Sequence, residues 1–339
     1  MVFRVAAGTR TGLGHLMRCL ALAQAADEAQ FPVQFVLDDE AATLAKARHD
    51  WHYPVQILPP VLNEVAQGQW LAEFLAQENA AVLVVDGYAF TPVILSAIDR
   101  EKTAVVVMDD GQQTLSGYAD MVVNPATVSL DAAYQAARPG IVCATGSAYR
   151  LLRREFALGR VLPIAQRHGL VVSLGGSDPC NLTLPLLKAL AQLTQDMPVR
   201  VITGAAYPYR RELEDWLSAT ALPVQHIHNC QDMAAVWQHA RLAVSAAGGS
   251  QFELGVCQTP AILVVVADNQ RNATAQALSE GWCESVNGHD EGVCEALAKR
   301  ALALYEDTTL LQHMSDNAAG HYDAEGATRV LQKMMELTR

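Results

Sequence analysis

A glycine-rich loop that ends in a histidine is the first segment of the sequence with the residue types needed for chemistry. The segment GTRTGLGH covers residues 8–15 and follows an apolar run at the amino terminus. Gly12 and Gly14 allow the backbone to turn tightly and to approach a ligand. Because the loop runs into an amphipathic segment, we expect His15 in the first turn of a helix, where the dipole favours the neutral imidazole. A neutral imidazole can accept a proton from water, whereas a capping or packing role for His15 explains the pattern equally well.

A second candidate is the segment SAAGGSQFELG (245–255), in which a predicted strand ends at Gly248 and Gly249. A helix that starts at Ser250 would present backbone N–H groups to a diphosphate. Glu253 would then have acceptors for both hydroxyls of a ribose. The structural alternative is a capping box, because Ser250 and Glu253 have the spacing that this motif requires.

The segment SLGGSDPCN (173–181) has the same organisation. A predicted strand ends in Gly175 and Gly176, the next two residues, Ser177 and Asp178, can cap a helix, and the proline that follows suits its first turn. A well-built junction between strand and helix explains these residues. The functional interpretation adds a phosphate or sugar group against the N–H groups of the helix start.

An amide-rich segment follows another predicted strand. In ADNQRNA (267–273), the side chains of Asn269, Gln270 and Asn272 offer paired donors and acceptors for sugar hydroxyls or acetamido groups. A polar helix cap is the structural alternative.

Acidic residues end two neighbouring predicted strands. Asp86 and Tyr88 lie in VVDGYAF, and Asp109 and Asp110 close the next strand. An acidic pair can bind a metal ion, but no further ligands lie nearby in the sequence, and adjacent acids at a strand end are often solvated turn residues. We therefore predict no metal site.

Apolar β-branched runs alternate with amphipathic segments along the whole chain. Continuous apolar runs are typical of parallel strands covered by helices on both faces, so the sequence predicts an α/β protein with doubly wound sheets. The pattern resets after residues 156–168, which carry glycine and proline and are interpreted as a linker. We expect two Rossmann-like domains, 1–155 and 169–339, the second with a helical tail, and a ligand in the cleft between them at the carboxyl ends of the strands. The expected strands cover residues 2–7, 33–38, 81–87, 104–110 and 120–125, then 170–176, 199–204, 223–230, 241–249 and 260–268.

The composition of the chain limits the kinds of partner and the compartment that we expect. The net charge of −12 argues against a nucleic-acid partner, because phosphate backbones select basic surfaces. It does not argue against a nucleotide, which backbone N–H groups can bind. The seven scattered cysteines are typical of a reducing compartment, and no segment is apolar over the ~20 residues that a membrane span needs. We expect a cytoplasmic protein with a small-molecule ligand and no stable membrane insertion; the oligomeric state is not predicted.

The motifs together resemble those of a known family, the UDP-sugar hydrolases of pseudaminic acid biosynthesis (PseG) with the related spore-coat polysaccharide proteins. The resemblance covers nearly the whole chain. It rests on GLGHLMRCLALAQA (12–25), VVDGY (84–88), YRLLRREF (149–156), SLGGSDPCNLT (173–183), AAGGSQFELG (246–255) and DNQRNA (268–273), in this order.

The resemblance implies a GT-B fold, similar to that of the MurG glycosyltransferase, and a function. The implied reaction is hydrolysis of UDP-2,4-diacetamido-2,4,6-trideoxy-β-L-altropyranose to the free sugar and UDP, with inversion at the anomeric carbon and without a metal or other cofactor. His15 matches the histidine that activates water, and Tyr88 matches a tyrosine near the sugar. The implied substrate-binding residues are Gly12, Gly14, Arg18, Asp86, Gly175, Gly176, Ser177, Gly248, Gly249, Ser250, Glu253, Asn269, Gln270 and Asn272.

Two features depart from the family pattern. The family usually has Arg-x-Asp on its first strand, whereas Ala6 stands here two residues after Arg4, and Thr145-Gly146 replaces a usual Gly-Pro pair. These departures leave three alternatives open: a glycosyltransferase of the same architecture, an inactive nucleotide-sugar binding protein, and an epimerase of UDP-sugars.

Overall fold

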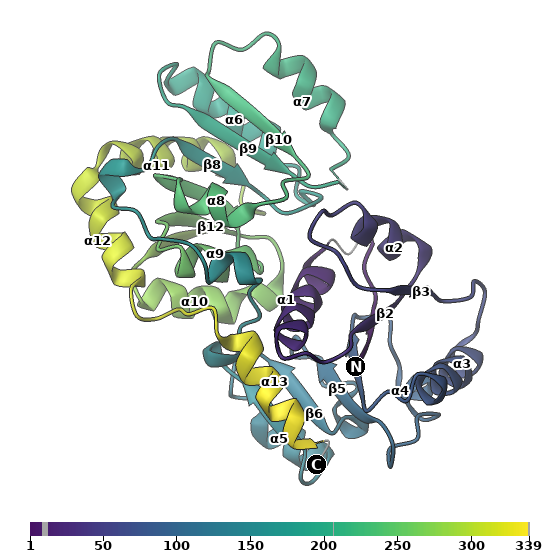
Figure 1. The fold of residues 1–339 in the computed structure, drawn as a ribbon. Helices are drawn as coiled ribbons and strands as arrows, with labels where there is room; N and C mark the ends of the chain where they lie inside the picture. The colour runs from purple at the N-terminus through teal and green to yellow at the C-terminus, as the bar shows by residue number, and fades with distance from the viewer. Residues whose placement is uncertain (9–12, 206, 338–339) are drawn as a thin grey trace. The chain divides into compact units, whose positions relative to one another are not determined.

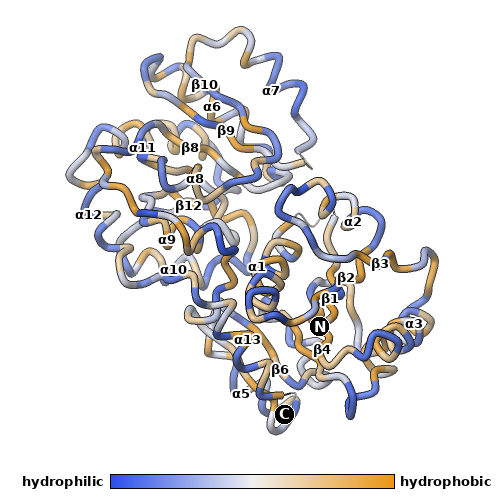
Figure 2. The backbone as a smooth tube through the Cα atoms, in the orientation of Figure 1, coloured by the Kyte–Doolittle hydropathy of each residue, from blue (hydrophilic) through white to orange (hydrophobic). Residues whose placement is uncertain are grey.

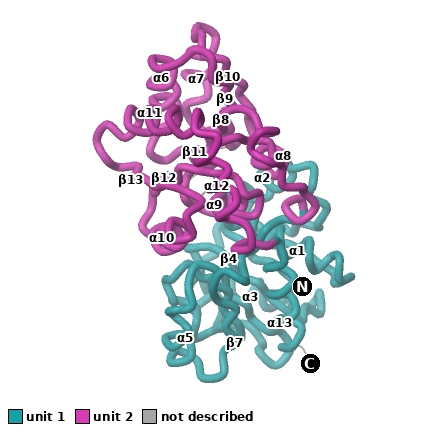
Figure 3. Tube along the Cα trace, turned by 90° about the vertical axis from the view of Figure 1, so that its left-hand side faces the viewer, with its two compact units in different colours: residues 1–154, 324–339 teal, residues 155–323 magenta. Residues whose placement is uncertain are grey.

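The chain forms two compact units in a computed structural model that describes residues 1–8, 13–205 and 207–337. Unit 1 comprises Met1–Arg154 together with Ala324–Arg339, and unit 2 comprises Glu155–Asp323 (Figure 3). Each unit is built on a parallel sheet with helices packed against it (Figure 1). The predicted α/β class with two doubly wound sheets is therefore confirmed.

The described part of unit 1 contains a seven-stranded sheet in the order β3-β2-β1-β4-β5-β6-β7, and every pairing in it is parallel. Its strands are β1 (Val2–Val5), β2 (Gln34–Leu37), β3 (Val55–Ile57), β4 (Val82–Asp86), β5 (Ala104–Met108), β6 (Met121–Asn124) and β7 (Val142–Thr145). Its α-helices are α1 (Gly14–Glu28), α2 (Asp39–Lys46), α3 (Glu64–Gln77), α4 (Pro92–Leu95), α5 (Asp131–Ala137) and α13 (Gly326–Leu337).

Alternation along the strands divides the core of unit 1 between two faces. Val84 packs with Leu16 of α1 and Val330 of α13, whereas its neighbour Leu83 packs with Leu71 of α3. Successive side chains of a strand point to opposite faces, so both faces of the sheet are buried. Burial on both faces explains the apolar strands, which Figure 2 shows in hydrophobic colours at β4 and β6.

Unit 2 repeats this organisation in a six-stranded parallel sheet, counted over its described residues, with the order β10-β9-β8-β11-β12-β13. Its strands are β8 (Leu170–Ser173), β9 (Val199–Thr203), β10 (Val224–His228), β11 (Leu242–Ala246), β12 (Ala261–Val265) and β13 (Cys283–Asn287). Its α-helices are α6 (Thr183–Leu193), α7 (Arg210–Leu217), α8 (Met233–Gln238), α9 (Ser250–Val256), α10 (Arg271–Ser279), α11 (Val293–Glu306) and α12 (Thr308–Ala318).

Each sheet contains a point at which the strand order reverses. In unit 1 this point lies between β1 and β4, and in unit 2 it lies between β8 and β11. The loops that leave two such strands run in opposite directions and open a crevice between them, which is where open α/β sheets bind ligands. The segments that precede His15, Ser177 and Ser250 in the sequence all leave strands at these points.

The sequence predicted the central strands but missed β3, β7 and β13. These three strands lie at or near sheet edges, where burial is partial and polar residues occur. In β3 and β13 polar residues interrupt the apolar run, and in β7 the run is short, so these strands give a weaker pattern than the strands that were recognised. The predicted strands also extend one to three residues too far at their carboxyl ends, because the chain leaves the ladder there to form the loops.

The division of the chain differs from the expected one at its end. The last helix, α13, belongs to unit 1 and not to the domain predicted over 169–339. Its residues Val330, Leu331 and Met334 are buried in the same cluster as Leu16 of α1. The helical nature of the tail is confirmed, but helical periodicity does not reveal which sheet a helix covers. The segment 156–168, predicted to be a linker, is part of unit 2.

Across the described residues, no helix combines the length and the apolar character that crossing a membrane requires.

Candidate functional site

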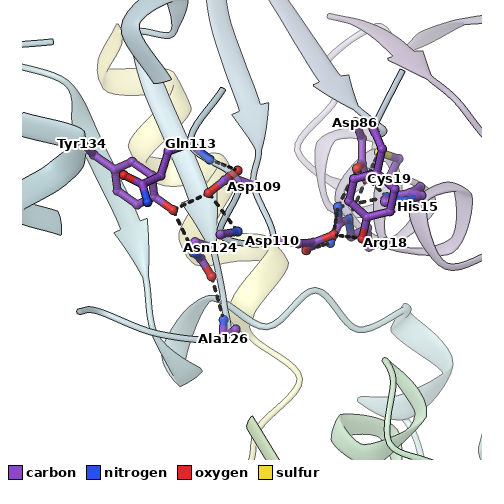
Figure 4. Close-up of polar contacts among 12 residues, drawn as sticks. His15, Arg18, Cys19, Asp86, Asp109, Asp110, Gln113, Asn124, Ala126 and Tyr134 are labelled. Atoms are coloured by element: carbon purple, nitrogen blue, oxygen red, sulfur yellow. Dashed lines mark hydrogen bonds and ion pairs between the residues drawn. The ribbon is translucent and has the colours of Figure 1, made fainter. Parts of the chain in front are cut away.

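The strongest candidate site in unit 1 lies at the reversal point of its sheet (Figure 4). His15 is the second residue of α1, the helix that follows β1, and Asp86 is the last residue of β4. Asp86 pairs with Val5 of β1 on one side and with Met108 of β5 on the other. The carboxyl ends of three adjacent strands thus bring together side chains that are far apart in the sequence.

Asp86 is the centre of this site. Its side chain is fully buried, and four donors surround its two oxygens. Oδ1 lies 2.7 Å from Nδ1 of His15 and accepts a hydrogen bond of 2.6 Å from Nη2 of Arg18. Oδ2 accepts hydrogen bonds from Nε of Arg18 at 2.6 Å and from Sγ of Cys19 at 3.3 Å. Three residues spaced on the first two turns of α1 therefore converge on one carboxylate.

The charge of Arg18 keeps this carboxylate ionised. Burial alone raises the pKa of Asp86, but the attraction and hydrogen bonds of Arg18, followed by those of His15, outweigh burial and hold the pKa well below its usual range. Burial also acts against the charge of Arg18, yet Asp86 and Asp110 together raise the pKa of the guanidinium well above its usual value. The buried pair is therefore charged on both sides at neutral pH.

The partners of His15 fix which ring nitrogen carries the proton of the neutral imidazole. An ionised carboxylate can only accept hydrogen bonds, so the contact with Asp86 requires a proton on Nδ1. The guanidinium of Arg18, which lies 3.0 Å from the same nitrogen, can only donate and already donates to Asp86. Nε2 is then the nitrogen with a free lone pair, which is the arrangement that a general base needs.

A pocket beside His15 continues the site. Asp110 receives Nη1 of Arg18 at 2.6 Å and the hydroxyl of Tyr88 at 2.7 Å. The ring of Tyr88 stands edge-on to the imidazole of His15, with centroids 4.8 Å apart. Burial and then Asp110 raise the pKa of the Tyr88 phenol, so Tyr88 stays a neutral hydrogen-bond donor at physiological pH. The pocket is lined by these residues and by Gly87, Phe90, Val107, Met108, Asp109, Gln112, Thr114 and Leu115.

Gly87 allows β1 and the turn after β4 to approach closely. Its φ is +144°, and a Cβ at this position would lie 2.6 Å from Cβ of Ala6. A side chain at residue 87 is therefore excluded. Ala6, the residue at which the sequence departs from the family pattern it resembles, packs against this glycine.

The structure revises one sequence-based assignment. Asp86 was expected to bind substrate, but its side chain is fully buried. Arg18 is held by two carboxylates and also lines the pocket, so its role in substrate binding stays a prediction. Both side chains are placed to orient His15 and Asp110. Two glycines of this region were also expected to bind substrate. Gly14 is the first residue of α1 and is exposed, and Gly12 lies outside the described residues.

Asp109 and Asp110, which were weighed as metal ligands, have other partners. Asp110 binds Arg18 and Tyr88, while Asp109 accepts hydrogen bonds from the backbone of Gly111 and from the hydroxyl of Tyr134. Within the described ranges, no three His, Cys, Asp or Glu side chains are grouped as metal ligands. The interpretation of these aspartates as solvated turn residues is wrong for Asp109, which is buried.

In unit 2, the segment after β11 forms the start of α9 but not the capping box. Gly249 has helical φ and ψ values of −55° and −29°, so Ser250 lies inside the helix, and no side chain caps its start. Glu253 accepts a hydrogen bond of 3.0 Å from the indole of Trp237. Gly248 and Gly249 stay accessible at the carboxyl end of the strand, and their assignment to a nucleotide, with Ser250 and Glu253, stays a prediction.

After β8, the cap of α6 is built differently from the expected one. The helix begins at Thr183, so the first turn does not contain Pro179. The buried carboxylate of Asp178 reaches forward and accepts hydrogen bonds from the N–H groups of Leu182 at 3.0 Å and Thr183 at 2.8 Å. These two N–H groups are therefore occupied by the protein's own carboxylate. Gly175, which has a φ of +89°, Gly176 and Ser177 lie in the preceding turn, and their binding role stays a prediction.

The amide-rich segment after β12 meets the glycines after β11. Gln270 accepts a hydrogen bond from the N–H of Val266 at 2.9 Å, and its Nε2 would lie 3.7 Å from a Cβ on Gly248. Asn269 and Asn272 are exposed on either side of Gln270. The structure thus brings two of the predicted binding segments together at the carboxyl edge of the unit 2 sheet.

Solved structures resemble the chain over nearly its full length. MurG from Acinetobacter baumannii matches 99% of this chain and 99% of its own, with a TM-score of 0.65 and 17% identity. The UDP co-structure of MnaA from S. aureus matches 99% of this chain and 97% of its own, with a TM-score of 0.70 and 12% identity. The chain has the GT-B fold. Within this GT-B protein, residues 170–330 match the model of the glycosyltransferase family 28 C-terminal domain.

Two curated relatives of this GT-B chain match it in sequence over different shares of its length. The spore coat polysaccharide biosynthesis protein SpsG of Bacillus subtilis is 24% identical over 279 residues, which span 80% of this chain and 79% of the relative. The UDP-N-acetylglucosamine–N-acetylmuramyl-(pentapeptide) pyrophosphoryl-undecaprenol N-acetylglucosamine transferase of Nostoc punctiforme is 28% identical over 174 residues. That match spans 50% of this chain and 47% of the transferase.

Sequence reasoning missed the contributions of Cys19 and Asp110 to the site. Cys19 is part of the motif GLGHLMRCLALAQA, but the sequence assigns it no role of its own, because a buried cysteine in a helix is usually a packing residue. A sequence signal for Asp110 did exist, because it belongs to an acidic pair that follows β5, the strand beside β4 at the reversal point. What could not be predicted is that Arg18 lies between Asp86 and Asp110.

Proposed function

We propose that the protein hydrolyses a UDP-linked diacetamido-trideoxy sugar of the UDP-2,4-diacetamido-2,4,6-trideoxy-β-L-altropyranose type to the free sugar and UDP, in pseudaminic or related nonulosonic acid biosynthesis. The observation that carries this proposal is the pairing of His15 with the buried, ionised Asp86 at 2.7 Å. This pairing leaves Nε2 as a base and stabilises the imidazolium that forms when it takes a proton.

Besides the pair of His15 and Asp86, the hydrolysis reaction needs few catalytic groups. Water gives a proton to Nε2 of His15 while its oxygen bonds to the anomeric carbon, and the bond from that carbon to the phosphate oxygen of UDP breaks. UDP is a good leaving group, so a strong general acid is not required. Tyr88 is assigned to the sugar. The negative charge that grows on UDP is assigned to backbone N–H groups around Gly249 and Ser250 of unit 2.

The comparisons support the nucleotide-sugar part of the proposal. The MnaA structure was solved with UDP, and the Nostoc relative is named as a transferase of N-acetylglucosamine from its UDP derivative. SpsG, whose match spans most of both chains, is named for polysaccharide biosynthesis. Together these matches support the use of a UDP-sugar by this chain and leave open whether water or another hydroxyl is its acceptor.

A glycosyltransferase is the second candidate. It is favoured by the family 28 match over residues 170–330 and by the transferase name of the Nostoc relative. In a transferase, Nε2 of His15 would take the proton of a sugar or lipid hydroxyl, and the same pair would serve. The hydrolase and the glycosyltransferase therefore differ in the acceptor, which is water in the first and a sugar or lipid hydroxyl in the second.

The deciding experiment is incubation with a panel of UDP-diacetamido-trideoxy sugars, first without an acceptor and then with an added hydroxyl acceptor, while UDP and sugar are followed by NMR. We expect release of UDP and free sugar in equal amounts. Release that needs an added hydroxyl acceptor indicates the transferase, a new UDP-sugar isomer indicates an epimerase, and UDP binding without any product indicates an inactive binding protein.

The role of His15 is tested in the same assay. His15→Ala should lower turnover by roughly 10²–10⁴-fold and leave the affinity for UDP unchanged, because the nucleotide is assigned to unit 2. His52→Ala, which removes an exposed histidine of the same unit, is the matched control. Near-normal turnover by His15→Ala removes this residue from the proposed role.

A further inference from the structure

Asp110 has a position that the hydrolysis step itself does not use. Its carboxylate lines the pocket beside His15 and is about one-fifth exposed. We propose that Asp110 is a specificity-determining residue, which accepts a hydrogen bond from an N–H or O–H group on the sugar part of the substrate. This inference rests on the proposed function, because it assigns the unit 1 pocket to the sugar.

The acceptor count of Asp110 leaves room for one more donor. Oδ1 accepts from Nη1 of Arg18 at 2.6 Å, and Oδ2 accepts from Nη2 of Arg18 at 3.2 Å and from the hydroxyl of Tyr88 at 2.7 Å. A carboxylate has about four acceptor positions, and the described residues fill three of them. The exposed part of the side chain faces the pocket, so a ligand can supply the fourth donor.

The charge of the pocket favours a neutral group at this position. Burial raises the pKa of Asp110, but the charge of Arg18 and its hydrogen bonds outweigh burial and lower the pKa below its usual value. Two ionised carboxylates, Asp86 and Asp110, then face one guanidinium. A phosphate placed among them would be repelled, whereas a neutral hydroxyl or amide would donate to an ionised acceptor, which makes a strong hydrogen bond.

The lining of the pocket also suits a sugar. Phe90 and Leu115 are buried apolar residues, while Gln112 and Thr114 add polar groups. Ligand sites commonly combine apolar walls with a few fixed polar groups that determine orientation. Asp110 adds an ionised acceptor to this lining.

A separate network of hydrogen bonds around the neighbouring residue Asp109 holds the backbone beside Asp110 in place (Figure 4). The neighbouring Asp109 accepts hydrogen bonds from the N–H groups of Gly111 and Gln113, both at 3.0 Å, and from the hydroxyl of Tyr134 at 2.5 Å. Asn124 donates to the same hydroxyl at 2.8 Å. Because this network fixes the backbone on one side and Arg18 fixes the carboxylate on the other, Asp110 is preorganised to discriminate between ligands. Tyr134 is accordingly a positioning residue.

The test combines Asp110→Asn with substrates that lack single donors. The parent UDP-diacetamido sugar is compared with its 3-deoxy analogue and with analogues in which an acetoxy group replaces one acetamido group. For one analogue, the wild-type protein should show a roughly 10- to 100-fold rise in KM, as expected for a lost hydrogen bond to a charged group. Asp110→Asn should show a similar rise with the parent sugar, and no further rise with that analogue.

Two control variants separate this result from a loss of folding or of the reaction. Asp50→Asn removes the partner of another Arg–Asp pair of unit 1, that with Arg48, and should leave KM and kcat unchanged. Tyr134→Phe should raise KM less than Asp110→Asn and keep the selectivity among the analogues. Equal KM values for Asp110→Asn and the wild type, with equal selectivity, overturn the inference.

The proposed function can fail without leaving this inference untested. If the wild-type protein turns over none of the UDP-sugars, that function fails. Binding of the free diacetamido sugar to the wild type and to Asp110→Asn is then measured by saturation-transfer NMR. A signal that Asp110→Asn weakens supports the inference, and equal signals, or no binding to the wild type, contradict it.

Discussion

A single buried carboxylate accounts for most of the organisation of the unit 1 site. Asp86 has no exposed surface and accepts from His15, Arg18 and Cys19. Such a group is stable only because every acceptor position is filled and the opposite charge lies beside it. The same contacts fix the imidazole, so the stability of this region and the orientation of the candidate base depend on the same residue.

This dependence predicts a pH effect on stability. The folded protein keeps Asp86 and Asp110 ionised below the pH at which the unfolded chain binds these protons, about 3.9 for an aspartate. The unfolded state therefore binds more protons in acid, and stability falls as the pH falls below that value toward the lower pKa of the folded state. Asp86→Asn should be less stable at neutral pH, by about 3 kcal/mol, and its stability should fall less steeply in acid.

Urea unfolding between about pH 3 and pH 7 measures both effects. Asp27→Asn, which changes an exposed aspartate of the same unit, should keep the wild-type slope in acid. An unaltered acid slope in Asp86→Asn would show that this carboxylate does not carry the predicted dependence.

At the residue scale, the sequence revealed which side chains matter but not what each one does. His15 was recognised because a glycine loop before a helix is a local pattern. The role of Asp86 depends on a contact across 71 positions of the chain, which no local pattern specifies. Substrate binding was therefore assigned to a residue that is buried under its own partners.

At the scale of single elements, the start of α6 shows how a helix can be capped from outside its first turn. Asp178 has a left-handed φ of +47° and accepts from the N–H groups of Leu182 and Thr183. An aspartate tolerates this backbone conformation better than most residues. The sequence identified a cap near this position, but it could not show that the chain makes a further turn before the helix begins.

Asp178→Ala should destabilise unit 2. The lost cap contributes about 1–2 kcal/mol, and the positive φ adds strain because alanine has a Cβ and no compensating hydrogen bond. Asp178→Asn keeps one acceptor oxygen and the tolerance for a positive φ, so it should lose much less. Thermal or urea unfolding of the two variants checks this order, which equal stabilities would contradict.

At the scale of the whole molecule, the carboxyl-terminal helix connects the end of the chain to its beginning. The chain leaves unit 2 after Asp323, and α13 then packs in the core of unit 1, where Val330, Leu331 and Met334 are buried beside Leu16. Gly326 permits the approach, since a Cβ there would lie 2.0 Å from the carbonyl oxygen of Arg150. Doubly wound sheets were predictable from the alternation of strands and helices, but the return of the tail was not.

Removal of residues 324–339 should therefore weaken unit 1 and leave unit 2 intact. Without α13, the apolar face of α1 is exposed, and hydrogen exchange measured by mass spectrometry should be faster in α1 and β1 but unchanged in β8 and β11. The milder variant Leu331→Ala should lose about 2–5 kcal/mol from unit 1, whereas Gln332→Ala, at the next and exposed position, should not change its stability. Faster exchange in unit 2 alone would contradict the assignment of the tail, because the apolar contacts of α13 would then have to support the other sheet.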